Sequence, residues 1–178
     1  MSEIKLQFAN LSDRHFGVTP GLAAAYAEAV TICLGRHHSS PQKVLLQDGA
    51  EDKQSIAEWN APDRRTQDGW ANKDDATEFG AYGLALAAVE LTRGMVAVRR
   101  AETRTGVDYY LGGPEAPADD LEASFRLEVS GTDEGNDTVI QSRLRQKLDQ
   151  ATAGASNLPA IATVVGFAAL KIVTADVK

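Results

Sequence analysis

The run GMVAVRRAETRTGVDYYLGGPEAPADDLEASFRLEVSG, residues 94–131, decides how this chain folds. It contains three segments typical of β-strands, each bounded by glycine, proline or acidic turn residues. These segments are MVAVRRAE (95–102), VDYYLGG (107–113) and ASFRLEVSG (123–131). Because the connections between them are short, the run predicts three consecutive strands of one sheet, arranged as a meander.

A helix is predicted on each side of this meander. The first helix is capped by Asp74 or Asp75, runs from about Ala76 to Thr92, and ends at Gly94. Its segment AYGLALAAV is apolar on more than one side, so we expect this helix to be buried.

The second helix is capped by Asp137 or Thr138 and runs to about Ala151. The β-rich runs AIATVVGF and LKIVTADV, within residues 160–177, follow it. A helix, three strands, a helix and a further strand predict an α/β fold in which helices flank a mixed central sheet.

The N-terminal part predicts a strand, a helix and a second strand. Glu3–Ala9 alternates apolar and polar residues, which is typical of a half-buried strand. Thr19 and Pro20 begin a helix that is expected to end near Gly35. The short apolar run KVLLQ, residues 43–47, predicts the second strand.

Residues 48–75 are polar and rich in charges, glycine and proline, so they predict a long surface connection with a short strand around Ile56–Trp59. Trp59 and Trp70 are expected to anchor this connection by packing. We therefore divide the chain into an N-terminal extension, residues 1–75, and a core, residues 76–178, packed together as one compact domain. The extension is expected to enlarge the sheet or to cover one of its faces.

The composition narrows the classes of function. The chain has 178 residues, 43% of them hydrophobic, and a formal net charge of −7, which argues against a general nucleic-acid coat. Its apolar runs are too short to span a membrane, and its first residues do not resemble a signal peptide. The single cysteine, Cys33, excludes an internal disulfide and a cysteine zinc cage. We expect a cytoplasmic protein with no membrane partner.

Acidic residues stand at three points of the predicted core. Asp108 follows Gly106-Val107 at the start of the second strand, Glu128 lies in the third strand (LEVS, 127–130), and Glu78 lies in the first helix. Carboxylates on neighbouring strands can share one Mg²⁺ or Mn²⁺ ion, which polarises a phosphate and activates water. Alternation along the strand places Glu128 on the same face as Arg126 and Ser130.

This element order and these acids resemble the PD-(D/E)XK superfamily, the restriction-endonuclease-like fold, over residues 76 to about 168. The resemblance implies a nuclease-like protein in which Asp108 and Glu128 hold Mg²⁺ or Mn²⁺ and Glu78 orients water. The substrate would be DNA or RNA. The runs HHSSP, GVDYYLG and RLEVSG also resemble a group of uncharacterised bacterial proteins, and that resemblance implies no activity.

The sequence departs from the superfamily at Ser130, which stands where the motif has a lysine. Serine cannot supply the positive charge that stabilises a pentavalent phosphate. Lys147 and Gln141 flank the apolar stripe of the second helix, so either can reach over the sheet edge. Lys147 or Arg145 would then neutralise the phosphate, while Ser130, Gln141 and Arg143 would bind substrate. The site is thus altered or degenerate.

Basic residues form two groups that can make a phosphate-facing surface or simply a solvated one. The groups are Arg93, Arg99, Arg100 and Arg104, and then Arg143, Arg145 and Lys147. Likewise, Asp108 and Glu128 can be ordinary acids paired with Arg126 or Arg143, and Glu78 can be a first-turn glutamate favoured by the helix dipole.

A different class of function remains open on the same scaffold. A catalytically inactive module that binds a protein partner or forms a homodimer, for example in a bacterial defence system, would need no motif lysine. His37 and His38 suggest a metal site, but zinc requires three or four converging ligands, so structural roles are expected for both. Cys33 is expected to be a small core residue.

Overall fold

The computed structural model describes residues 4–154 and 156–177. The helices are the 3₁₀ turn η1 (Leu11–Asp13), α1 (Pro20–His37), α2 (Arg64–Gly69), α3 (Lys73–Arg93) and α4 (Asp137–Ala153). The strands are β1 (Gln42–Asp48), β2 (Glu51–Ala57), β3 (Val96–Arg100), β4 (Tyr109–Gly112), β5 (Phe125–Thr132), β6 (Ala160–Gly166) and β7 (Lys171–Asp176).

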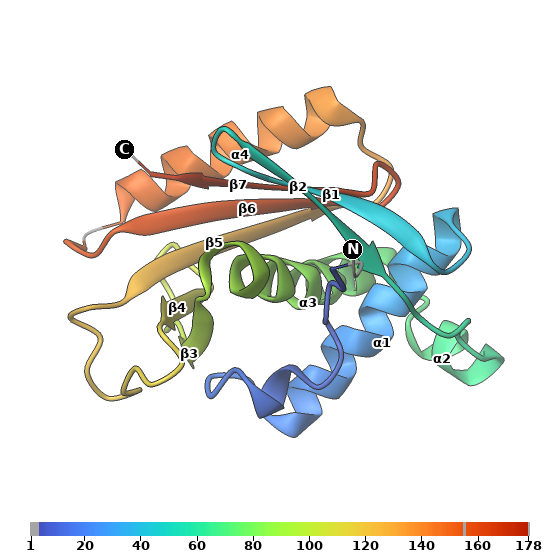
Figure 1. Cartoon of the computed structure of the whole chain (residues 1–178), viewed down its shortest axis with the longest axis horizontal. Helices are drawn as coiled ribbons and strands as arrows, with labels where there is room; N and C mark the ends of the chain where they lie inside the picture. The colour runs from blue at the N-terminus through green and yellow to red at the C-terminus, as the bar shows by residue number, and fades with distance from the viewer. Residues whose placement is uncertain (1–3, 155, 178) are drawn as a thin grey trace.

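All seven strands form one mixed sheet in the order β2-β1-β7-β6-β5-β4-β3 (Figure 1). The predicted meander is confirmed, because β3, β4 and β5 pair antiparallel. Helix α4 then crosses over, so that β6 lies parallel to β5, and β7 turns back antiparallel to β6. The α/β class with a mixed, helix-flanked sheet is therefore correct.

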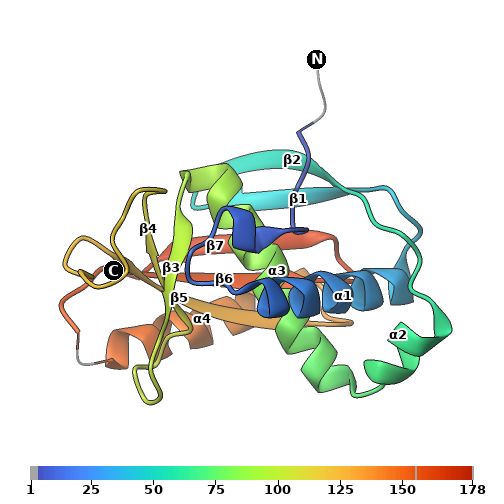
Figure 2. The same cartoon turned by 90° about the horizontal axis from the view of Figure 1, so that it is seen from below.

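Helices cover both faces of the sheet, α1 and α3 on one and α4 on the other (Figures 1 and 2). The strands alternate accordingly. Ile161 and Val165 of β6 belong to the large core beneath α1 and α3, whereas Ala162 and Val164 belong to a smaller core beneath α4. This alternation of apolar residues is what a strand buried on both faces requires.

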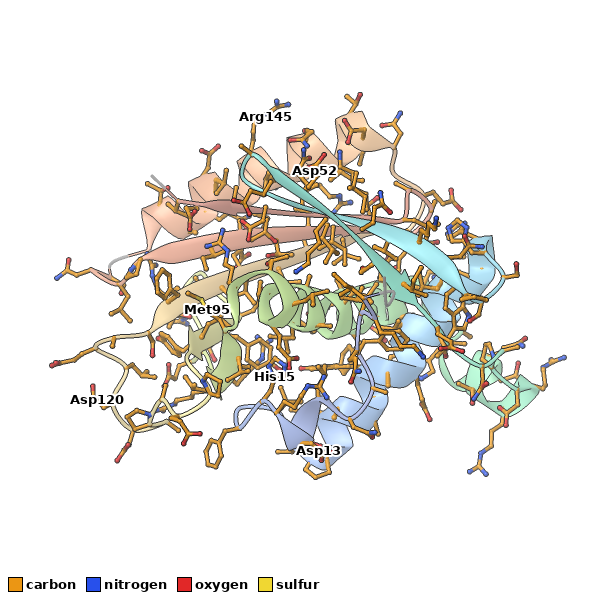
Figure 3. The ribbon with its side chains drawn as sticks, in the orientation of Figure 1. Asp13, His15, Asp52, Met95, Asp120 and Arg145 are labelled. Carbon is orange, nitrogen blue, oxygen red and sulfur yellow. The ribbon has the colours of Figure 1, made fainter. Side chains whose placement is uncertain are left out.

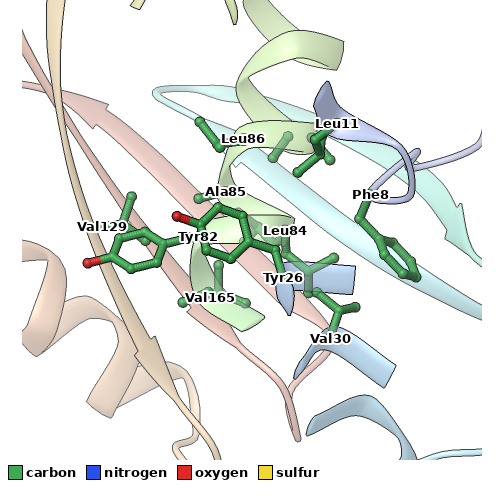
Figure 4. Packing of buried hydrophobic residues seen from close by; sticks show 14 of the residues in the cluster. Phe8, Leu11, Tyr26, Val30, Tyr82, Leu84, Ala85, Leu86, Val129 and Val165 are labelled. Atoms are coloured by element: carbon green, nitrogen blue, oxygen red, sulfur yellow. The ribbon is translucent and has the colours of Figure 1, made fainter. Parts of the chain in front are cut away.

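Small residues let α1 and α3 pack closely. A Cβ atom at Gly83 would lie 2.9 Å from Cγ2 of Val30, and one at Gly80 would lie 3.3 Å from the carbonyl oxygen of Ala29. Figure 4 shows the cluster in which Tyr26 and Val30 of α1 meet α3. Helix α3 is thus held between α1 and the sheet.

Residues 1–75 contribute to the same layers. Strand β1 pairs in parallel with β7, and β2 closes a hairpin with β1 at this edge of the sheet. The prediction of a long surface connection over residues 48–75 is wrong in most of its length, because it contains β2 and α2. The sequence of β2, EDKQSIA, is charged because this edge strand exposes much of its surface.

The predicted N-terminal strand is also wrong. Glu3 lies outside the described residues, and beyond it only an isolated parallel bridge joins Lys5 to Ile56. Leu6 and Phe8 are buried as the alternation predicts, but Ile4 is 42% exposed. The chain leaves the sheet because it turns at Asn10, which has a left-handed φ of 53°.

Three helix ends differ from the predictions. Gly35 does not end α1, which continues to His37 and closes with a hydrogen bond from the N–H of His38 to the carbonyl oxygen of Leu34. Helix α3 starts earlier than expected, since Asn72 accepts hydrogen bonds from the main-chain N–H groups of Asp74 and Asp75. Asn136 caps α4 in the same way, through the N–H of Val139.

Candidate functional site

The site lies where the edge of β5 is left open. Strand β4 pairs with β5 only as far as Leu127, whose carbonyl oxygen accepts a hydrogen bond of 2.7 Å from the main-chain N–H of Asp108. Beyond that point the Asp108 side chain takes the place of the strand, because its Oδ2 accepts a hydrogen bond of 2.8 Å from the N–H of Val129. Asp108 is thereby fixed beside the second half of β5.

Helix α3 approaches β5 closely at this edge. A Cβ atom at Gly131 would lie 2.9 Å from both the carbonyl oxygen of Thr77 and Cβ of Ala81. A glycine is therefore needed for the helix to lie this near the strand. The close approach brings Glu78, on the next position of α3, to the open edge.

A cavity of about 610 Å³ occupies this edge, and we call it the acidic cavity. Glu78, Asp108, Glu128 and Lys147 all line it. They come from four different elements: α3, the turn before β4, β5 and α4. The structure thus brings together the four residues that the sequence singles out for catalysis.

Tyr82 and Arg100 join two of these acids. The Tyr82 hydroxyl lies 3.0 Å from Oε1 of Glu78 and 3.0 Å from Oδ1 of Asp108. Its single proton can serve only one carboxylate at a time. Arg100 donates to the Tyr82 hydroxyl at 3.1 Å and to the main-chain carbonyl of Asp108, and its guanidinium lies 3.3 Å from Oδ1 of Asp108.

The Arg100 guanidinium lies over the aromatic rings of two tyrosines. The Arg100 guanidinium lies 4.8 Å from the ring centre of Tyr82 and 4.9 Å from that of Tyr109, and the Tyr109 hydroxyl is 2.5 Å from that of Tyr26. Burial raises the pKa of all three tyrosines. They therefore stay protonated and act as hydrogen-bond donors at neutral pH.

Glu128 forms an ion pair with Lys147 inside the cavity. The lysine Nζ lies 2.6 Å from Oε1 of Glu128, and the side chains are only 22% and 9% exposed, respectively. Burial raises the pKa of Glu128, the ion pair with Lys147 opposes this rise, and the charge of Asp108 adds to it. Lys147 thus supplies the positive charge that Ser130 cannot.

The residues expected to bind substrate divide into two groups. Ser130 and Arg143 line the acidic cavity, where Nη1 of Arg143 lies 3.4 Å from the Ser130 hydroxyl. Gln141 and Arg145 are not among the lining residues, and Arg145 projects from the outer surface of α4 (Figure 3). The turn of the helix that points Lys147 at the sheet carries Arg145 away from it.

The alternative pairings expected for Glu128 are not formed. Arg126 donates instead to the carbonyl oxygens of Leu158 and Ala151. The first basic group is also dispersed: Arg93 pairs with aspartates at the other side of the molecule, and Arg99 pairs with Glu102. Of that group, Arg100 alone is in contact with the predicted site residues within the described chain.

The histidines and the cysteine have structural roles. Nε2 of His37 lies 2.9 Å from Asp133, and Nε2 of His38 lies 3.0 Å from the carbonyl oxygen of Phe167. His15 is fully buried between Glu90 and the N–H of Ala97. Burial raises the pKa of the Cys33 thiol to about 12, so it is not a reactive thiolate at neutral pH.

The donors around the cavity suit a hard divalent cation. Within residues 4–154 and 156–177, no group of three or more histidine, cysteine, aspartate and glutamate side chains is arranged to hold a metal ion. Mg²⁺ nevertheless often uses only one or two carboxylates and keeps several waters. Asp108 and Glu128 provide two carboxylates, and Oε2 of Glu128 has no hydrogen-bond partner among the described residues. The cavity has room for the waters.

The sequence alone does not single out Tyr82 or Arg100 as parts of the site. The four-residue spacing between Glu78 and Tyr82 is the signal for the first, because such residues lie on one face of a helix. Arg100 is brought to the site by pairing with Tyr109 across β3 and β4, which only the strand register reveals.

Comparison of the chain with family models, with curated proteins and with solved structures finds no match. No helix among the described residues is both long and apolar enough to cross a membrane.

Proposed function

We propose that the protein is a nuclease-like phosphodiesterase that hydrolyses nucleic acid with the help of Mg²⁺ or Mn²⁺. The observation that carries the proposal is the meeting of Glu78, Asp108, Glu128 and Lys147, from four elements, in one cavity. The mixed sheet, with its β3–β4–β5 meander, α4 crossover and parallel β6, is compatible with the element order expected of a restriction-endonuclease-like core, and this also supports the proposal.

Asp108 and Glu128 would hold the cation, which supplies charge stabilisation at the phosphate and lowers the pKa of water when bound. Tyr82 and Arg100 position Asp108 through hydrogen bonds, and the N–H of Val129 fixes its other oxygen. Glu78 shares the Tyr82 hydroxyl and would orient the attacking water.

Lys147 and Arg143 supply positive charge to the substrate phosphate. The Lys147 ammonium is already in the cavity on Glu128, and Arg143 reaches its rim beside Ser130. A lysine carried by α4 can therefore take the role of the lysine missing from β5. A preorganised cation of this kind stabilises developing negative charge at little reorganisation cost.

The test is hydrolysis of supercoiled DNA, single-stranded DNA and RNA in the presence of Mn²⁺. We expect cleavage of at least one of these substrates and its loss in Asp108→Ala. The matched control is Asp52→Ala, which removes an exposed aspartate of β2 outside the cavity. Cleavage that survives Asp108→Ala at the unmodified rate would show that the acidic cavity is not the active site.

One observation favours a second candidate, a catalytically inactive module that binds a protein partner or a second copy of the chain. Each metal-binding acid already has a basic neighbour, Arg100 for Asp108 and Lys147 for Glu128, so the cavity is partly neutralised internally. This candidate predicts no hydrolysis and no uptake of Mn²⁺, which distinguishes it from the first.

A further inference from the structure

A second cavity, of about 790 Å³, adjoins the acidic cavity and takes no part in the proposed hydrolysis. It lies between the end of α1, the segment before α2, and the loop that leads from α2 into α3. Trp59 and Trp70 both line it, and we call it the tryptophan cavity. Lys73, the first residue of α3, lines both cavities, so the two cavities are neighbours at this residue.

The lining of the tryptophan cavity has a distinctive charge. It contains Arg36, His38 and Lys73 but no aspartate or glutamate, although the chain as a whole has 25 acidic and 18 basic residues. Each of two cations also has an acidic partner: Arg36 forms an ion pair of 3.5 Å with Asp133, and Lys73 lies 4.0 Å from Glu134. A guanidinium and an ammonium each carry several N–H donors, so both cations can still donate to an anion that enters the cavity.

The two indole rings give the same cavity a rigid apolar wall. Trp70 packs against Phe79 with ring centres 5.5 Å apart, and its Nε1–H donates to Glu28 at 2.9 Å. Trp59 is nearly buried and lies beside Gly35. In the described part of the chain the indole N–H of Trp59 has no acceptor, so it is available to a ligand. Gln67 adds an amide at the rim.

An apolar aromatic wall, a free N–H donor and two cations suit a ligand with a flat ring and a phosphate. The volume is within the range of about 300 to 1,000 Å³ that is usual for small-ligand sites. Proteins that bind single strands combine stacking aromatics with basic groups along the backbone. The bases of a duplex are stacked and paired, so they cannot enter such a cavity.

We infer that the tryptophan cavity binds one nucleotide of a single-stranded nucleic acid whose backbone continues past Lys73 into the acidic cavity. The base lies against Trp59 and Trp70, and Arg36 and Lys73 bind the neighbouring phosphates. This inference rests on the proposed function and specifies its substrate as a single strand.

Intrinsic fluorescence tests the inference directly, because both tryptophans of the chain line this cavity. Trp59 also borders two other surface cavities, so Trp70 is the more specific reporter. The full chain is titrated, without a divalent cation, with an oligothymidylate and an oligouridylate of about twelve nucleotides, and with a duplex of similar length. We expect saturable quenching by one or both single strands, and quenching by the duplex that is at least about tenfold weaker. Trp59→Phe and Trp70→Phe then assign the quenching to a ring.

Charge variants provide the second readout. Arg36→Gln removes a cation that lines only the tryptophan cavity, whereas Arg65→Gln removes an exposed arginine of α2 that lines neither cavity. We expect Arg36→Gln to weaken binding about tenfold and to reduce the salt dependence by about one phosphate contact. Arg65→Gln should bind like the unmodified chain.

Hydrolysis of bis(p-nitrophenyl) phosphate separates this inference from the proposed function, because that small diester has no flanking nucleotide. Quenching that is lost in Arg36→Gln supports the tryptophan cavity even when no diester is hydrolysed, an outcome that would contradict the proposed function alone. Absence of quenching by every single strand, or equal binding by Arg36→Gln and Arg65→Gln, overturns the inference whatever the hydrolysis assay shows. Circular dichroism verifies that each variant is folded.

Discussion

Two arginine–aspartate networks lie at different places on the same sheet. They differ in whether their carboxylates line a cavity that a ligand can enter. Arg93 donates two hydrogen bonds to Asp48, of 2.7 and 2.5 Å, and two to Asp176, of 2.8 and 3.4 Å. None of the three residues lines the acidic or the tryptophan cavity. Arg100 binds Asp108 at the rim of the acidic cavity, where Glu78 and Glu128 add two more carboxylates.

The difference shows how a structural ion pair is distinguished from a candidate site. The pairing with Asp48 and Asp176 raises the pKa of Arg93, and the network closes β1 and β7 onto the end of α3. At the acidic cavity, Glu78, Asp108 and Glu128 meet Arg100 and Lys147, and one tyrosine proton is shared between two carboxylates. Each network has one acid more than it has bases, but the acids of the second line the acidic cavity, whereas Asp48 and Asp176 line neither cavity.

The largest expected effect follows from exchanging the aspartate of each network. Asp108→Asn should lower Mn²⁺-dependent hydrolysis by about a thousandfold, since it removes a charge that acts in the transition state. Asp48→Asn should leave the hydrolysis rate per folded molecule unchanged. Steady-state kinetics on one DNA substrate measures both. Equal losses of activity in the two variants would remove the distinction between the networks.

A smaller loss is expected from Lys147→Met, about a hundredfold in hydrolysis, because the phosphate loses a preorganised cation.

The pH dependence of hydrolysis should change as well. Burial raises the pKa of Glu128, so Glu128 takes up a proton at a higher pH than an ordinary glutamate as the solution is acidified. Activity that needs the carboxylate is then lost early on the acid side.

Lys147 opposes this rise, so Lys147→Met should move the acid limb of the pH–rate profile to still higher pH. Lys43→Met, which removes an exposed lysine of β1, is the matched control. An acid limb at the same pH in Lys147→Met and in the unmodified chain would mean that Glu128 does not govern it.

The free energy of unfolding, unlike the hydrolysis rate, should depend on the Arg93 network. Arg93→Gln is expected to lower the free energy of unfolding by about 2 kcal/mol, because Arg93 and Asp48 are only 15% and 17% exposed and the aspartate loses its partner. Urea denaturation measures this change. Arg99→Gln, which breaks an exposed pair with Glu102, should cost about 0.5 kcal/mol or less. Similar costs for both would show that the Arg93 network adds no special stability.

The smallest effect concerns His15 and pH. Nδ1 of His15 accepts from the N–H of Ala97, so Nε2 carries the proton that is donated to Glu90, and burial lowers the pKa of the ring. Stability from the neutral ring is complete above the ordinary histidine pKa and is lost as the pH falls below it. A proton on Nδ1 would cost about 1 kcal/mol, because the N–H of Ala97 loses its acceptor.

Denaturation at a series of pH values checks this prediction. His15→Asn keeps an oxygen that can accept from Ala97 but does not titrate, so the decline in stability between about pH 7 and pH 5 should become shallower. An identical decline in the variant would exclude His15 as its cause.

The sequence predicted the core more accurately than the edge of the sheet. Strands buried on both faces, such as AIATVVG of β6, are continuous apolar runs and are easily recognised. Only the end of β2 is predicted, by the short strand expected around Ile56–Trp59, because the rest of this exposed edge strand is charged and resembles a loop. Gly35 predicts a helix end that the structure places two residues later, because a glycine does not by itself stop a helix.

The candidate site was predictable in its acids but not in their partners. Alternation along β5 correctly placed Glu128 on the face of Ser130, toward α4, where Lys147 and Arg143 reach the two residues. The division of Arg93 and Arg100 between two networks depends on which aspartate each meets across the sheet. Residues seven positions apart in one basic group carry no sequence signal that separates these roles.

Calorimetric titration with Mn²⁺ tests the central claim, that Asp108 and Glu128 form a cation site, most directly. The account predicts saturable binding of Mn²⁺ to the unmodified chain and to Asp52→Asn, and its loss in the folded double variant Asp108→Asn, Glu128→Gln. Absence of binding to the unmodified chain, or equal binding by the double variant, would contradict it.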